Sequence, residues 1–147
     1  SMFQDARAFN SNITSWNTGA VTNMYRMFSN IDTVTVLFNQ PIGVWNTSNV
    51  QNMGEMFYFC TSFNQPIGTW NISNVTNFSG FMTGKTAADY STTNYNALLN
   101  GWSSRPVQPN ITINFTGIQY TNAGGSAARA ILTGAPNNWT IFDGGGI

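Results

Sequence analysis

The sequence predicts an α/β fold, a right-handed solenoid of strand-turn-helix repeats of about 25 residues, capped at its C-terminal end by a larger β-α-β region. The first observation is a duplication: FNQPIGVWNTSNVQNMGEMF at residues 38–57 returns as FNQPIGTWNISNVTNFSGFM at residues 63–82. The second is a weaker copy that begins at Phe9, and the third is a strand-helix-strand pattern after residue 110. Stacked copies would bury apolar faces that one copy cannot bury alone.

Three tryptophans mark equivalent positions in the copies, at spacings of 29 and then 25 residues. The extra residues of the longer spacing fall in SNIDTVTVL, residues 29–37. Apolar residues recur at fixed distances from each tryptophan, and this spacing indicates a core shared by all copies. The expected core residues are Trp16, Trp45, Trp70, Ile13, Ile42, Ile67, Met24, Met53, Phe28 and Phe57.

Each copy has two halves with different patterns. The first, FNQPIGxW, combines Pro and Gly with widely spaced apolar residues, and predicts a turn or a short extended segment with a few strand residues. The second, SNVxNMxxMF, places its apolar residues on one side of a helical wheel and predicts a short amphipathic helix. In the middle copy, Ser48 and Gln51 fit a capping box at the start of that helix.

The N-terminal residues match the end of a further copy. The Met-Phe pair at residues 2–3 stands before Phe9 as the pair at residues 56–57 stands before Phe63. An uncapped end of a repeat array exposes apolar surface. We therefore expect upstream repeats of the same chain to pack against the first copy.

The C-terminal region, residues 83–147, is expected to hold irregular repeats that continue the solenoid of the array at residues 1–82. Its patterns place Tyr95, Leu98, Leu99 and Trp102 inward on one helix, and Ala128, Ile131 and Leu132 inward on another. Two strands that flank a helix of this length normally pair in parallel. The expected elements are a helix at 91–102, a strand at 111–115, a helix at 124–135 and a strand at 139–142.

The composition argues against several function classes. Five basic and five acidic residues give zero net charge, so we expect no nucleic-acid partner. No apolar run reaches membrane-spanning length, so we expect no direct membrane insertion. Without His, a G-x-S-x-G motif, a P-loop or clustered acidic residues, the chain predicts no enzyme, no metal site and no cofactor. Cys60 is interpreted as a small buried hydrophobe, with a reactive thiol or an intermolecular crosslink as the alternatives.

The repeat MF-x-x-C-x-x-F-N-Q-x-I-G-x-W-N, found here at residues 56–71, resembles the BspA-like leucine-rich-repeat surface proteins. These include the repeat domain of mycoplasma lipoproteins and of other bacterial surface proteins, with occasional viral members. The tail, from Tyr95 to WTIFDGG at residues 139–145, resembles their usual C-terminal segment. The resemblance implies an LRR-like solenoid that is secreted or held on a bacterial cell or virion surface. It also implies adhesion or partner binding and no catalytic residues.

Two sets of repeated side chains each have two interpretations. The tryptophans are interpreted as core residues, and the alternative is a row of glycan-stacking platforms, which would require exposure. The repeated asparagines are interpreted as a ladder that satisfies loop backbone groups, and the alternative is a polar binding stripe. The ladder residues are Asn17, Asn46 and Asn71, together with Asn10, Asn39 and Asn64.

The sequence as a whole predicts a non-enzymatic surface module for adhesion, or for recognition of a protein or glycan on another cell or matrix. One alternative is a structural spacer or self-assembly element of a surface or virion protein, and another is a carbohydrate-binding accessory module. Repeat arrays present their variable positions on a shared face, and Val44 and Thr69 vary between near-identical copies. The candidate binding residues are Gln40, Pro41, Val44, Gln65, Pro66, Thr69, Asn12 and Ser15.

Overall fold

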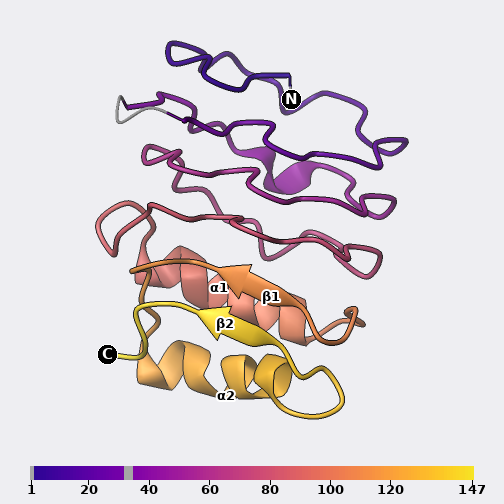
Figure 1. The fold of residues 1–147 in the computed structure, drawn as a ribbon, viewed down its shortest axis with the longest axis vertical. Coiled ribbons are helices and arrows are strands. Elements are labelled where there is room, and N and C mark those ends of the chain that lie inside the picture. Colours follow the sequence, from indigo (N-terminus) through magenta and orange to yellow (C-terminus); the bar gives the residue numbers. More distant parts are fainter. Residues whose placement is uncertain (1, 32–34) are drawn as a thin grey trace.

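Helices and strands are concentrated in the C-terminal part of the protein. The computed structural model describes residues 2–31 and 35–147. Figure 1 shows the repeats at the N-terminal end of the long axis and the helices towards the other end. The elements in chain order are the 3-10 helix η1 (Ile42–Val44), helix α1 (Thr92–Ser103), strand β1 (Thr112–Asn114), helix α2 (Asn122–Thr133) and strand β2 (Thr140–Phe142).

The four elements expected after residue 90 are confirmed. Helix α1 follows the N-cap Ser91, whose Oγ accepts a hydrogen bond from Asn94 N at 3.2 Å, and α2 follows Thr121 in the same way. These caps satisfy amide groups that the first turn of a helix leaves unpaired. Strands β1 and β2 pair in parallel, with Ile113 opposite Ile141, as expected for strands that flank a helix.

The inward faces of the two helices follow the expected pattern with one exception. The four residues expected inward on α1 are buried, and so are Ala128 and Leu132 of α2. Ile131 was also expected inward, and this prediction is wrong, because its side chain is 53% exposed. The buried side of α2 is a narrow stripe through Gly125, Ala128 and Leu132, and Ile131 lies beside that stripe.

The prediction of an LRR-like solenoid of strand-turn-helix repeats is wrong. In the described part of residues 2–85, the helical structure is η1 alone, and isolated bridges at Asn23, Asn52 and Asn77 stand in place of strands. The expected helix of SNVxNMxxMF is a series of turns in each copy, so Ser48 caps no helix. The regular elements are two α-helices and a two-stranded parallel sheet, preceded by repeats that are built from turns.

Asparagine side chains and left-handed residues explain why the second half of each repeat is not helical. The Oδ1 atoms of Asn23, Asn52 and Asn77 each accept a hydrogen bond, at 2.9 Å, from the backbone N–H two residues later. Such bonds hold the backbone in turns that compete with a helix. A positive φ shortly afterwards is incompatible with a right-handed helix. The equivalent left-handed residues are Arg26 (φ 54°), Glu55 (φ 52°) and Gly80 (φ 65°).

Each repeat forms one layer of a stack. We define the first, second and third layers as residues 9–30, 38–59 and 63–84. In the second half of each layer, backbone N–H groups of alternate residues donate to carbonyl oxygens of the next layer, as from Met24 N to Asn52 O at 2.8 Å. Figure 1 shows these layers one above another. Residues 32–34, inside the predicted insertion at 29–37, lie outside the described residues.

Phenylalanine rings continue from layer to layer through the core. Phe38 lies between its equivalents Phe9 and Phe63, with ring centroids 5.9 and 6.0 Å away. Phe28 stacks on Phe38 at 3.8 Å, and Phe57 stacks on Phe63 at 4.0 Å. Because equivalent rings meet one another, a repeated sequence produces a continuous core.

Candidate functional site

The repeat tryptophans link neighbouring layers through their indole N–H groups. Trp45 Nε1 donates to Ile13 O at 3.0 Å, and Trp70 Nε1 donates to Ile42 O at 3.1 Å. Both rings are buried, at 4% and 0% exposure, which leaves no face for stacking a glycan. The remaining expected core residues that the structure buries are Ile13, Ile42, Ile67, Met24, Met53, Phe28 and Phe57.

Trp16 differs from the other two repeat tryptophans. Its ring stacks on Trp45 at 6.5 Å on one side, yet the side chain is 40% exposed. The expectation that Trp16 is a core residue is therefore wrong for this structure, because its other side is not covered by a complete layer.

The expected asparagine ladder divides into two sets with different roles. Asn17, Asn46 and Asn71 are exposed, and each Oδ1 accepts a hydrogen bond from the backbone N–H two residues later, within its own layer. The set that crosses layers runs from Asn10 through Asn39 to Asn64. Asn10 Oδ1 accepts from Asn39 N, and Asn39 Oδ1 accepts from Asn64 N, both at 2.9 Å. Both sets satisfy loop backbone groups.

The candidate glutamines are engaged between layers. Gln40 Nε2 donates to Asn10 O at 2.8 Å, and Gln65 Nε2 donates to Asn39 O at 3.1 Å. Asn94, in α1, makes the equivalent bond to Asn64 O at 2.9 Å. These amides therefore hold the stack together, and a partner would have to displace an existing bond to use them.

The remaining candidates of the second and third layers come together in one shallow depression of about 250 Å³. It is lined by Pro41, Gly43, Val44, Pro66 and Thr69. Val44 is 74% exposed, and Thr69 Oγ1 donates to Gly43 O across the layers at 2.7 Å. The lining is mostly apolar.

The two first-layer candidates lie apart from this lining. Asn12 and Ser15 are exposed, and Asn12 Oδ1 accepts from Thr14 N at 3.0 Å and from Thr14 Oγ1 at 2.7 Å. Asn12 therefore shapes its own turn.

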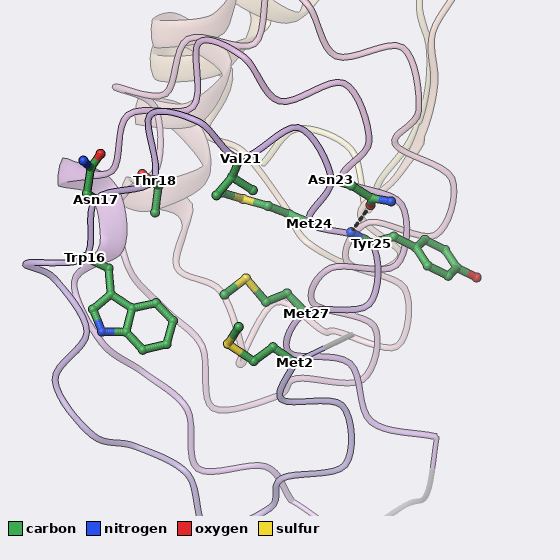
Figure 2. A pocket seen from close by; sticks show the side chains of 9 residues that line it. All are labelled: Met2, Trp16, Asn17, Thr18, Val21, Asn23, Met24, Tyr25 and Met27. Atoms are coloured by element: carbon green, nitrogen blue, oxygen red, sulfur yellow. Dashed lines mark hydrogen bonds between the residues drawn. The ribbon is translucent and has the colours of Figure 1, made fainter.

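A second cavity, of about 310 Å³, lies at the outer side of the first layer. Figure 2 shows the Trp16 ring and the thioethers of Met2 and Met27 facing this space. The sequence pattern indicated an exposed end here, through the unmatched Met-Phe pair at residues 2–3. It did not indicate that Trp16 would contribute to that exposed surface.

The buried ionisable groups serve the structure. Asp143, whose side chain is 3% exposed, accepts hydrogen bonds from Tyr95 Oη at 2.7 Å and from Arg129 Nε at 2.9 Å. Burial raises the pKa of Cys60 to about 11 and lowers the pKa of Lys85 to about 8. Lys85 Nζ donates to Phe63 O at 2.7 Å. Cys60 is therefore a protonated, enclosed thiol at neutral pH.

The described residues offer neither a metal site nor a membrane span. No three Asp, Glu or Cys side chains of these residues gather where they could hold an ion. Neither α-helix in this part of the chain has the length and apolarity needed to cross a bilayer.

Comparison with known proteins gives one match. The family described as "Mycoplasma protein of unknown function, DUF285" matches residues 1–102, which include the three layers and most of α1. No curated protein and no solved structure matches the chain. The match covers more than half of the sequence, and the chain therefore belongs to the DUF285 family.

Proposed function

We propose that this protein is a non-enzymatic, surface-exposed repeat module that binds a protein partner outside the cell. The observation that carries the proposal is the depression between the second and third layers. There the variable residues Val44 and Thr69 lie together with Pro41 and Pro66. The resemblance to BspA-like surface proteins supports a role in adhesion, and membership of the mycoplasma family DUF285 is compatible with a place on the cell surface.

The chemistry of the depression favours a protein over a glycan. Sugar hydroxyls that lose water need hydrogen-bond partners, and an apolar lining supplies few of them. Trp45 and Trp70 are buried and offer no stacking surface. An apolar peptide side chain, in contrast, gains free energy by covering Pro41, Val44 and Pro66.

Two probes separate these ligand classes. A random peptide library displayed on phage is selected against the protein, and a glycan array is tested in parallel. We expect peptides with apolar residues at fixed positions and no glycan signal. The Val44→Glu variant should lose most of the peptide binding, since it places a charge in an apolar contact.

The matched control is Ala123→Glu, at an exposed position of α2 away from the depression. It should bind the selected peptides as the unmodified protein does. If Val44→Glu binds the selected peptides as well as the control variant does, the depression is not the binding site. A reproducible glycan signal that survives both variants would contradict the proposal in favour of a carbohydrate-binding module elsewhere on the surface.

A further inference from the structure

The layers join through a regular backbone ladder. Between the second and third layers, the N–H groups of Met53, Glu55, Phe57 and Phe59 donate to the carbonyl oxygens of residues 77, 79, 81 and 83, at 2.8 to 3.0 Å. Between the first and second layers, residues 24, 26, 28 and 30 donate in the same way to residues 52, 54, 56 and 58, also at 2.8 to 3.0 Å. Each interface between complete layers thus has four equivalent bonds.

Among the described residues, the outer edge of the first layer has the second half of this ladder alone. Phe3 N donates to Met27 O at 3.0 Å, and Asp5 N donates to Ser29 O at 2.9 Å. These bonds are equivalent to the last two bonds of the other interfaces. The acceptor equivalent to the first is Asn23 O, which receives no hydrogen bond from the described residues. The position equivalent to the second donor is residue 1, which lies outside the described residues.

The side chains at the same edge are also incompletely covered. Trp45 and Trp70 lie under a preceding layer, and each donates its indole N–H to an isoleucine carbonyl of that layer. Trp16 is the equivalent residue of the first layer, and it borders the 310 Å³ cavity together with Met2 and Met27 (Figure 2). The Asn23 carbonyl, which has no donor among the described residues, and an exposed indole therefore face the same side of the stack.

We propose that this edge binds one further layer of the same repeat, a segment with the pattern FNQxIGxWNxSNVxNM. Its backbone N–H group, four residues before Phe3, would donate to Asn23 O. The carbonyl of its isoleucine would accept from Trp16 Nε1. Phe3 and Asp5 already set the register in which the added layer would pair with the first one. The added layer would therefore repeat an interface that occurs twice within the protein. This packing is independent of the binding proposed for the depression.

A second copy of the protein fits this edge less well. Phe3 and Asp5 of the same chain already occupy the last two positions of the ladder, so a second copy could reach only its first half. Addition of chain to an exposed edge depends on matched donors and acceptors of the main chain.

The test is an extended protein in which residues 38–55 are placed directly before Met2, in place of Ser1. In the extension, the copy of Trp45 is changed to phenylalanine, so that Trp16 remains the only indole at that edge. The matched control carries the same added residues in scrambled order. We expect the in-register extension to lower acrylamide quenching of Trp16 several-fold and to raise Tm by several degrees, and the scrambled one to do neither.

Hydrogen exchange gives a second readout. The extension amide that copies Met53 should become protected, since it would donate to Asn23 O. The extension leaves the three existing layers unchanged, so circular dichroism can verify that they fold. Unprotected extension amides in a folded protein would overturn the proposal. So would a concentration-dependent dimer of the unextended protein in which Trp16 is shielded, because a second copy would then be the occupant.

Discussion

The layered repeats and the C-terminal region satisfy their backbone in different ways. In α1 and α2, most amide groups bond within the helix itself, and a cap at Ser91 or Thr121 completes the first turn. In the second half of each layer, alternate amides bond to the next layer, and the amides between them bond within their own layer, as from Met27 N to Met24 O. A layer therefore depends on its neighbour for part of its backbone hydrogen bonding, whereas a helix carries its own hydrogen bonds.

The two regions nevertheless meet through the same contacts that join layer to layer. Trp102 of α1 donates its indole N–H to Ile67 O at 3.2 Å, as Trp70 does to Ile42 O. Asn94 takes the place of the repeat glutamines on Asn64. Helix α1 thus replaces the first half of a repeat and preserves its contacts with the layer before it.

The largest expected effect comes from Trp70→Ala in the third layer. This removes a fully buried ring and its bond to Ile42 O, and should lower the free energy of unfolding by about 3–5 kcal/mol. Trp16→Ala is the matched control, and should cost about 1–2 kcal/mol because its ring is already partly hydrated. Urea unfolding followed by circular dichroism measures both. Equal losses would show that the outer layer is as well packed as the inner ones.

Asp143→Asn tests how much a buried carboxylate stabilises the C-terminal region. The carboxylate joins α1, through Tyr95, to α2, through Arg129. Its replacement leaves the guanidinium without its ionic partner and should cost about 2–3 kcal/mol in urea unfolding. Asp89→Asn is the control, because the Asp89 carboxylate accepts its hydrogen bonds from its own turn, from Thr86 N and Thr86 Oγ1, and joins no two helices. A comparable loss in both variants would contradict a special role for Asp143.

Sequence reasoning succeeded in the C-terminal region because its patterns are local. The spacing of Leu98, Leu99 and Trp102 and the alternation in ITINF each point to one secondary structure. It failed in the layers, where apolar residues keep a helical spacing while Asn23, Asn52 and Asn77 bend the backbone into turns. These turns place alternate N–H groups against the carbonyl oxygens of the neighbouring layer, which stabilises them. The apolar pattern of one copy does not show that such a layer is present.

The candidate binding surface was predictable from the sequence only in part. Val44 and Thr69 stand out because they vary between near-identical copies, and the structure places them in one depression. The use of Gln40 and Gln65 between layers could not be read from composition, although their exact 25-residue repetition is a signal of a structural role. The exposure of Trp16 depends on what covers its layer, and its spacing is the same as that of a core residue.

Gly68→Ala tests the junction between the two regions. A Cβ at this position would collide with the carbonyl oxygen of Ala97 in α1. The helix would have to move away from the third layer, and we expect a loss of about 1–2 kcal/mol and faster hydrogen exchange in α1. Gly117→Ala is the control, because its Cβ would meet only ordinary contacts of 3.7 Å or more. An unchanged exchange rate in α1 would show that the junction is looser than the backbone contact indicates.

The smallest expected effect is a change in the free energy of unfolding with pH, caused by two buried groups that follow the second and third layers, Cys60 and Lys85. Lys85 has a folded pKa of about 8, lowered by burial from 10.5, so above pH 8 the unfolded chain binds more protons and stability rises with pH. Cys60 has a folded pKa of about 11, raised by burial from 9.0, so its contribution falls as pH increases above 9. Between pH 8 and 9 the lysine dominates, and the free energy of unfolding should rise by roughly 0.5 kcal/mol.

Two variants separate the contributions of Lys85 and Cys60 in urea unfolding at pH 7, 8, 9 and 10. Lys85→Met keeps an apolar stem in the buried space and should abolish the rise between pH 8 and 9. Cys60→Ala should steepen that rise and extend it towards pH 10, because the opposing thiol is gone. A rise that persists unchanged in Lys85→Met would mean that another group binds the proton. The ammonium would then be as well stabilised by the carbonyl of Phe63 as it is by water.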